Sequence, residues 1–472
     1  MPHRLTLCQM TELIRARKLS PVELMEAHLK QIAKLNPAVN AFIRVLEEPA
    51  RVAAKAAEQV LSTAGPVLPT LHGIPVSIKD SFNMAGLPTT CGSRFFADSR
   101  PAHDAAAVAR LKQAGAIPIG KTNCPEFLSN YESDNFVAGR TNNPWDLERT
   151  SGGSSGGESA VIAAFFSAGG IGSDGGGSIR VPAHFSGIAG LKPTPGRISA
   201  AGHVPEMNHP TGLIGVAGPM ARTAHDLRLL FRVLAGYDSE DPFSAPVPLR
   251  EPDLRSTRIG LMPQFYRVPV EAGVARALEK AARCLADLRF PLEPFQPSGL
   301  EAAPNLWWFF FGELPARLTA EIIRGREDQA HWTGTEFMQQ ALAEPEPTAK
   351  KILENLALRD KMRARLLREM EQYPVILMPP CGIAAFRHRQ RRFETPAKTI
   401  GLFEAMMPAT PINLLGLPAV VIPFDRDERG LPVGVQLVAR PYEEELLLEL
   451  AIRMEEARGP LLGPPILLRD NT

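Results

Sequence analysis

The spacing of apolar residues along the chain changes near residue 70, from a helical period to short strand-like runs. Before that point, Ser20-Pro21-Val22-Glu23 predicts a helix start, because serine caps free backbone N–H groups and proline is tolerated at the first helical position. Apolar residues follow at helical spacing up to Leu35, and Asn36-Pro37 predicts the end of the helix. Residues 1–65 are therefore expected to form a helical N-terminal segment.

Beyond residue 70, apolar runs separated by glycine and proline alternate with helical patterns. The strands expected from these runs are 74–78, 117–120, 375–378, 419–423 and 433–438, and the helices are 104–113 and 443–458. Residues from about 250 to 400 carry more charge and a mainly helical pattern. Alternation of this kind is typical of an α/β fold, so we predict a mixed, mostly parallel central β-sheet covered by helices on both faces.

Composition and charge narrow the class of protein. Of the 472 residues, 44% are apolar and 22% are charged, which is ordinary for a globular chain. Lys and Arg number 52 against 51 Asp and Glu, so the net charge of +1 encodes no general attraction to nucleic acid or to an anionic membrane. No apolar run is long enough to span a bilayer, and the N-terminus lacks the pattern of a signal peptide.

Cysteine and histidine positions argue against disulfides and metal sites. The five cysteines are widely spread and form no C-x-x-C pair, which is typical of thiols in a reducing compartment. The ten histidines include no H-E-x-x-H motif, and the spacing of His203 and Glu206 is expected to arise by chance. We therefore predict a cytoplasmic protein that needs no metal and no cofactor.

The glycine- and serine-rich stretch 151–160 permits several interpretations. A flexible linker is one, but the apolar helical run 160–168 follows at once, and linkers do not normally adjoin a buried helix. Residues 152–156 also satisfy G-x-S-x-G, the nucleophile elbow of α/β-hydrolases, which requires a strand directly before it. Residues 142–149 are polar and contain Pro144, so no such strand is expected and the elbow is disfavoured.

A second glycine-rich stretch covers residues 169–183. Residues 170–175 fit the dinucleotide fingerprint G-x-G-x-x-G, but no acidic residue follows between Asp174 and Glu206 to bind a ribose. Three consecutive glycines at 175–177 can instead turn their N–H groups toward one point, as in a site for an anion or a developing oxyanion. Ser178 directly behind them is either a nucleophile or only a helix N-cap, and the local sequence leaves both open.

A third motif, 72–80, delivers Lys79 at the end of an apolar strand. A lysine there is usually solvent-seeking. If burial instead lowers its pKa, the neutral amine becomes a base that could activate a serine.

Taken in order, the lysine after G-I-P-V, then GGSSGG, then GSDGGGSIR, resemble the signature of the amidase signature family. Further sequence segments that resemble the family surround them, including GKTN at 120–123 and GLKPTPGRIS at 190–199. The blocks that match the family closely span 72–236 and 408–458. The resemblance implies one large amidase-signature domain over 1–472. Its expected sections are the helical segment 1–65, a catalytic core 66–245, a variable helical region 246–400 on the substrate side, and a return to the core in 401–472.

The resemblance also implies roles for individual residues. It implies a Ser–cis-Ser–Lys triad, with Ser178 as nucleophile, Ser154 as bridging serine after a cis peptide bond, and Lys79 as base. The N–H groups expected to form the oxyanion hole are those of Gly175, Gly176, Gly177 and Ser178. Ser155 and Arg180 are expected to hold the hydrogen-bond network around the triad.

Two positions in the sequence bear on which amide the protein would cleave. One branch of the family is the A-type subunit that releases ammonia from glutamine for a partner during the repair of misacylated glutamyl-tRNA. That branch has Asp-Gln where this chain has Val216-Ala217, and an acidic residue where Met406 falls here. We therefore expect a stand-alone amidase acting on a small amide, and the A-type subunit remains the alternative.

Three further features bear on partners. The aromatic run 307–311 and the pair Met406-Met407 would suit an apolar acyl or aryl amide, although helix packing or an oligomer contact is the favoured explanation of the aromatic run. The basic run 387–392 is expected to be a solvated loop rather than a nucleic-acid contact. A homodimer is compatible with the sequence.

Overall fold

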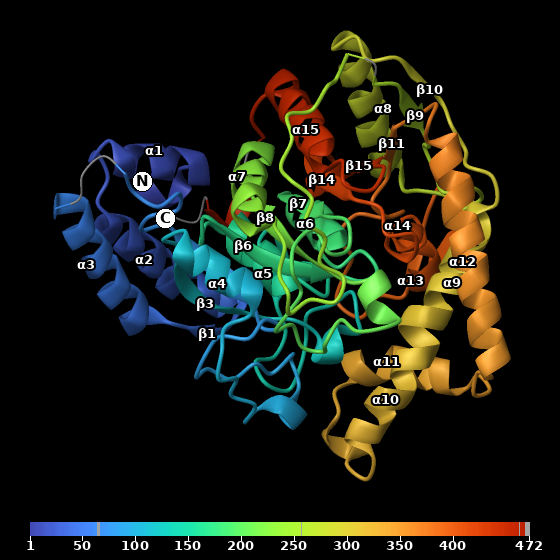
Figure 1. Ribbon diagram of the computed structural model, residues 1–472, viewed down its shortest axis with the longest axis horizontal. Helices are drawn as coiled ribbons and strands as arrows, with labels where there is room; N and C mark the ends of the chain where they lie inside the picture. The colour runs from blue at the N-terminus through green and yellow to red at the C-terminus, as the bar shows by residue number, and fades with distance from the viewer. Residues whose placement is uncertain (64–66, 256, 462, 468–472) are drawn as a thin grey trace.

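One large β-sheet runs through the molecule. The computed structural model describes residues 1–63, 67–255, 257–461 and 463–467, and within them the sheet has eleven strands in the order β1-β3-β2-β6-β8-β7-β14-β15-β11-β9-β10 (Figure 1). Its strands are β1 (Phe42–Val45), β2 (Pro75–Lys79), β3 (Ile117–Thr122), β6 (Gly169–Asp174), β7 (Ala189–Lys192), β8 (Val216–Ala221), β9 (Ile259–Leu261), β10 (Leu292–Pro294), β11 (Val375–Met378), β14 (Ala419–Arg426) and β15 (Pro432–Ala439). Two small hairpins lie outside it, β4 (Asn142–Asn143) with β5 (Asp146–Thr150) and β12 (Arg392–Glu394) with β13 (Thr399–Gly401).

The sheet is mixed, as expected. Parallel pairs join β3–β2–β6 and β11–β9–β10, and the other neighbouring strands of this sheet pair antiparallel. Parallel neighbours need a crossover connection. The chain supplies one through α4 (Ala106–Gln113) between β2 and β3. Among the described strands, parallel pairs occur only in these two parts of the sheet, and antiparallel pairs outnumber them.

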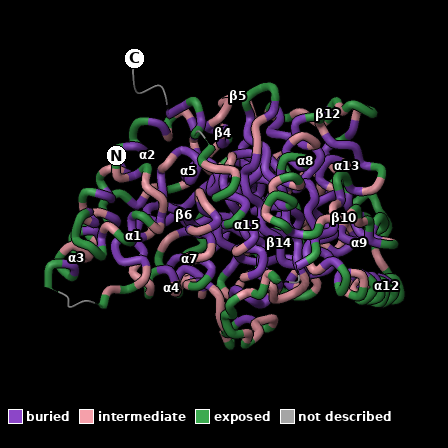
Figure 2. The backbone as a smooth tube through the Cα atoms, turned by 90° about the horizontal axis from the view of Figure 1, so that it is seen from above, coloured by how far each residue is buried: buried purple, intermediate pink, exposed green. Residues whose placement is uncertain are grey.

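Helices cover both faces of the sheet. The helices besides α4 are α1 (Leu7–Arg15), α2 (Pro21–Val39), α3 (Glu47–Thr63), α5 (Gly156–Ala163), α6 (Arg180–Ser186), α7 (Ala224–Leu234), α8 (Ala272–Asp287), α9 (Ala303–Trp308), α10 (Leu314–Ile323), α11 (Trp332–Leu342), α12 (Ala349–Glu369), α13 (Leu402–Met406), α14 (Thr410–Leu414) and α15 (Glu444–Arg458). A core cluster shared by α1, α4, α7, α8 and α15 lies on one face, and α5 and α6 pack on the other. Figure 2 shows the buried residues concentrated between these layers.

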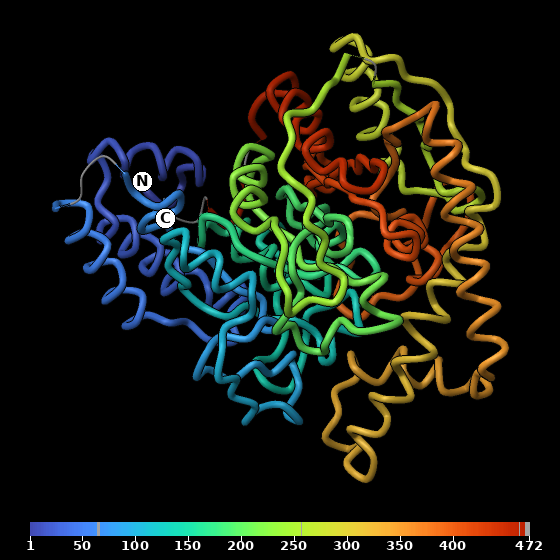
Figure 3. The backbone as a smooth tube through the Cα atoms, in the orientation of Figure 1, coloured from blue at the N-terminus to red at the C-terminus, as the bar shows by residue number. Residues whose placement is uncertain are grey.

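The region 246–400 is less helical than its sequence pattern predicts. It contributes β9, β10 and β11 to one end of the sheet, while α9 to α12 gather at the side opposite the N-terminal helices (Figure 3). Strands from all four predicted sections thus join one sheet, and the chain forms a single domain. The predicted boundary between residues 65 and 66 lies outside the described residues.

One predicted helix end is wrong. Helix α2 begins at Pro21 with Ser20 as its cap, as predicted, but it continues through Pro37 to Val39. A proline removes only one helical hydrogen bond, and the helix ends where Asn40 takes a left-handed conformation at φ 51° and the Asn36 side chain accepts the N–H of Ala41.

The sequence predicted neither a membrane span nor a metal site. The described residues contain no helix long and apolar enough to cross a membrane. They also contain no cluster of three or more His, Cys, Asp or Glu side chains that could hold a metal ion. All five cysteines are free thiols.

Candidate active site

Lys79 lies at the end of β2, in the interior of the molecule. Side chains alternate along a strand, so Val76 and Ile78 enter the core cluster on one face and Lys79 points to the other. Its Nζ donates to Ser154 Oγ at 2.7 Å and to Ser173 Oγ at 2.9 Å. The side chain is fully buried, and desolvation lowers the pKa of Lys79 to about 8. The solvent-seeking alternative is therefore wrong.

Ser154 sits in the turn between β5 and α5. The peptide bond Gly153–Ser154 is cis, as the resemblance implied. A strand does precede this turn, contrary to the sequence prediction, but β5 belongs to a small hairpin outside the central sheet. The next residue, Ser155, ties the turn to its surroundings, because its N–H donates to the carbonyl of Ser178 at 3.1 Å and its Oγ donates to the carbonyl of Ser173 at 3.2 Å.

Ser178 does not cap a helix. Helix α6 begins at Arg180, its N-cap position is Ile179, and no side chain caps that position. The N–H groups of Ile179 and Arg180 at the start of the helix donate instead to the carboxylate of Asp174, at 3.0 and 3.3 Å. Of the two roles that the sequence left open for Ser178, the capping role is wrong.

A buried ion pair holds the turn around Ser178. Arg180 contacts both carboxylate oxygens of Asp174 at 3.0 Å, and neither side chain is exposed. The guanidinium and the N–H donors hold the pKa of Asp174 well below its usual range. Arg180 also reaches Asn413 and Gln436 of the C-terminal section. Sequence reasoning named Arg180 but missed Asp174, which stands inside the same motif.

The glycine turn 175–177 lies between β6 and Ser178. The N–H of Gly177 donates to Asp174 Oδ1 at 2.7 Å, so one of the four predicted oxyanion donors already has a protein partner. The predicted donors Gly175, Gly176 and Ser178 line the cavities described next.

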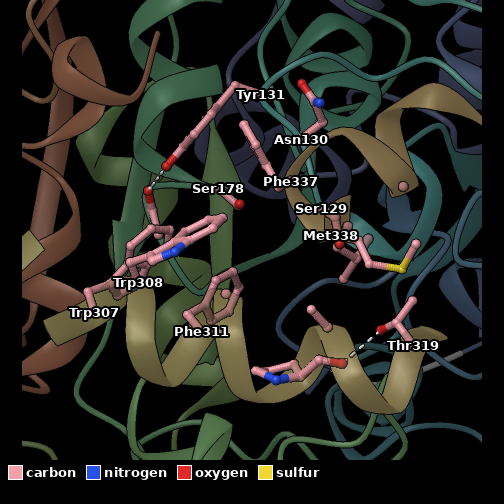
Figure 4. Close-up of a pocket in the computed structure, with 16 residues that line it drawn as sticks. Ser129, Asn130, Tyr131, Ser178, Trp307, Trp308, Phe311, Thr319, Phe337 and Met338 are labelled. Atoms are coloured by element: carbon pink, nitrogen blue, oxygen red, sulfur yellow. Dashed lines mark hydrogen bonds between the residues drawn. The ribbon is translucent and has the colours of Figure 1, made fainter. Parts of the chain in front are cut away.

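Two cavities meet at Ser178. The smaller, of about 70 Å³, is walled by Tyr131, Trp307, Trp308, Phe311 and Phe337 (Figure 4). The larger, of about 440 Å³, also contains Ser154 and Ser173 in its wall. The three residues of the predicted triad are thereby brought together, Lys79 by its hydrogen bond to Ser154 and Ser178 by sharing a cavity with Ser154.

A comparison with protein families agrees with this geometry. The family model described as Amidase matches residues 23–448.

The chain belongs to the amidase signature family.

Individual relatives within this family differ in what they do. The A-type subunit of the glutamyl-tRNA(Gln) amidotransferase of Chloroflexus aggregans is 34% identical over 478 residues, with 95% of each chain covered. A structure described as a vestigial protein complex that reveals the evolutionary origins of an s-triazine catabolic enzyme matches with a TM-score of 0.89 and 27% identity, over 98% of this chain and 99% of that one. The 6-aminohexanoate cyclic dimer hydrolase complexed with substrate matches with a TM-score of 0.86 and 28% identity, over 99% of both chains.

The aromatic run 307–311 serves two purposes. Trp307, Trp308 and Phe311 line the smaller cavity, whereas Phe309 and Phe310 are buried in a core cluster. A π-helical turn over Phe309–Glu313 separates these side chains around the helix axis. The sequence favoured packing for the whole run and thus missed the cavity wall. Met406, which was expected to suit an apolar substrate, is packed in another core cluster and lines neither cavity.

The basic run 387–392 is largely a loop with Arg387, Arg389 and Arg392 exposed, as predicted, but Arg391 joins it to the core. Arg391 pairs with Glu132 and Glu336, both at 2.6 Å, and Arg389 and Arg391 both lie over the ring of Trp332. Glu132 is buried, where a carboxylate is costly unless it is paired and hydrogen-bonded. The predicted loop is therefore a structural connection between the core and α11.

Proposed function

We propose that this chain is a stand-alone amidase that hydrolyses the amide of a small, uncharged acyl group through an acyl-Ser178 intermediate. The observation that carries the proposal is the fully buried Lys79 hydrogen-bonded to Ser154, in the wall of a cavity that Ser178 shares. Because burial lowers its pKa to about 8, a useful fraction of Lys79 is neutral near that pH and can accept a proton.

The reaction has two halves. Ser178 Oγ attacks the amide carbon while its proton passes through Ser154 to Lys79, and backbone N–H groups of the glycine turn stabilise the oxyanion. The C–N bond then breaks as the same proton returns through Ser154 to the departing nitrogen. Water then attacks the acyl-Ser178 ester while its proton passes through Ser154 to Lys79. The bond between the acyl carbon and Ser178 Oγ breaks as that proton returns to Ser178 Oγ, and the acid leaves as the carboxylate.

The position of Ser154 supports an assignment of the two cavities to the two parts of the substrate. The departing nitrogen takes its proton from Ser154, so the amine belongs in the larger cavity, whose wall contains Ser154. The acyl group then belongs in the smaller cavity. That cavity, of about 70 Å³, has no charged side chain among the described residues of its wall and is smaller than the roughly 150 Å³ that holds a benzene ring. A short apolar acyl group fits this description.

The alternative is the A-type subunit of an amidotransferase that takes ammonia from glutamine. It is favoured by the 34% identity to such a subunit over 95% of the chain. Against it, no lysine or arginine of the described residues lines either cavity, so the carboxylate of a bound glutamine would have no permanently charged partner. As part of the same proposal, we expect the protein in the cytoplasm, where its free thiols stay reduced.

Labelling and turnover together test the proposal. The wild type should release amine from short-chain anilides and form a covalent adduct with a fluorophosphonate, and Ser178→Ala should lose both. Ser129→Ala is the matched control, because Ser129 also lines both cavities and should be dispensable for labelling. Equal labelling of wild type and Ser178→Ala would mean that another residue is the nucleophile. Release of ammonia from glutamine, without anilide turnover, would favour the amidotransferase alternative.

A further inference from the structure

We propose that Trp307 and Tyr131 are positioning residues for the oxyanion hole, because their side chains hold the carbonyl groups of the glycine turn. The proposal rests on the proposed function, since it concerns how the site stabilises an oxyanion. Neither residue belongs to the glycine motif: Trp307 comes from α9 in the variable region, and Tyr131 from the segment between β3 and β4.

Trp307 holds the first peptide of the turn. Its Nε1 donates to the carbonyl of Gly175 at 2.7 Å, and the indole is buried. The carbonyl of Gly175 and the N–H of Gly176 belong to one planar trans peptide and point in opposite directions. A hydrogen bond that fixes the carbonyl therefore fixes the direction of the Gly176 N–H, which is one of the predicted oxyanion donors.

Tyr131 holds the next peptide. Its hydroxyl donates to the carbonyl of Gly176 at 2.8 Å, as Figure 4 shows. The N–H of the same peptide, on Gly177, donates to Asp174. This peptide is thus held at both ends. Burial raises the pKa of Tyr131, so the hydroxyl keeps the proton that it donates.

Packing leaves the turn little room beside these aromatic residues. A Cβ added to Gly175 would lie 2.2 Å from the Phe311 ring, and one added to Gly176 would lie 2.4 Å from the Trp307 ring. The rings of Trp307 and Phe311 are stacked, with centroids 5.1 Å apart. Only glycine fits beneath them.

The same indole therefore does two things. It forms part of the wall of the proposed acyl cavity, and it orients a donor for the oxyanion. Free peptides in water would reorient when negative charge develops, whereas donors that are already fixed stabilise the charge without that cost. Residues of the variable region should consequently affect kcat as well as acyl selectivity.

Kinetics with matched variants can test this proposal. Trp307→Phe and Tyr131→Phe each remove one hydrogen bond and keep an aromatic ring. Trp145→Phe is the control, because it also removes an indole hydrogen bond to a backbone carbonyl, that of Ser186, but lines neither cavity. We expect Trp307→Phe and Tyr131→Phe to lower kcat by about tenfold or more with little change in KM, a smaller loss than deletion of a direct oxyanion donor. Trp145→Phe should leave both kcat and KM within about threefold.

A pair of inhibitors separates positioning from general damage. An aldehyde with the acyl group of the best substrate forms an oxyanion adduct with Ser178, and the corresponding alcohol does not. Both test variants should lose about tenfold in affinity for the aldehyde and keep their affinity for the alcohol. Equal losses for both inhibitors, or an unchanged kcat in both variants, would overturn the proposal. If even the wild type fails to bind a fluorophosphonate, the proposed function fails instead.

Discussion

Lys79 illustrates how burial turns an ordinary side chain into a reactive one. In water its ammonium would be almost fully protonated near neutral pH. Here the side chain is completely buried at the end of β2 and desolvation lowers its pKa to about 8. The amine keeps two hydroxyl partners, Ser154 and Ser173, so the neutral form can accept a proton while its position stays fixed.

The pH dependence of turnover follows from that pKa. Only neutral Lys79 accepts the proton of the nucleophile, and Lys79 loses its own proton as pH rises through about 8. We expect kcat/KM for an uncharged anilide to be about tenfold lower at pH 7 than at pH 9. Lys79→Met should remove most of the activity at both values. Lys192→Met is the control, because Lys192 is also buried, has a pKa lowered to about 7 and lines neither cavity. A flat profile in the wild type would contradict the role of Lys79.

The helices α9 to α11, with the π-helical turn between α9 and α10, build the walls of the proposed acyl cavity. The wide turn brings Trp307, Trp308 and Phe311 to one side, and Phe337 of α11 closes the cavity opposite them. The rings of Trp308 and Phe337 meet edge to face at 6.2 Å. Acyl selectivity is therefore expected to depend on how these two helical segments face each other.

Replacing a large side chain in the wall of the proposed acyl cavity with a small one should change the preference for the acyl group. Phe337→Ala would enlarge a cavity of about 70 Å³, so the ratio of kcat/KM for a benzoyl anilide to that for an acetyl anilide should rise by about tenfold or more. Phe96→Ala alters the larger cavity and should leave this ratio nearly unchanged while affecting bulky amines. Kinetics with a series of acyl anilides measures both effects. A ratio that responds to Phe96→Ala and not to Phe337→Ala would reverse the assignment of the two cavities.

Charged side chains connect distant parts of the whole molecule. Arg391 bridges Glu132, in the segment between β3 and β4, and Glu336 of α11. A backbone N–H from Arg389 also reaches Glu132 at 2.9 Å. Arg391 is thus one of the groups that attach α11 to the core, and its loss would leave the buried Glu132 without that guanidinium.

Removing that guanidinium should destabilise the protein. For Arg391→Gln we expect the free energy of unfolding to fall by about 3 kcal/mol, because a buried carboxylate loses its partner. Arg255→Gln, which breaks an ion pair whose side chains are 90% and 57% exposed, should hardly change the free energy of unfolding. Urea unfolding measures both. Similar small losses in the two variants would show that Arg391 holds no more than a surface pair does.

Several features of the protein follow from patterns within short stretches of the chain. Apolar periodicity indicated the strands 375–378 and 433–438 closely, and glycine motifs marked the turns that carry Ser154 and Ser178. Family membership also followed from these motifs, and it is confirmed by the match over 23–448. Such signals lie within a few residues of one another, so they can be read without the fold.

Other features arise because segments that are distant in the sequence meet in the fold. Neighbours far away in the sequence determine whether Lys79 is buried and whether Ser178 caps a helix. They also determine which rings of the aromatic run face a cavity. Trp307 meets Gly175, and Arg391 meets Glu132, across the whole fold. The physical reason is that desolvation and hydrogen bonding act through space. A residue's own sequence neighbours therefore cannot determine them.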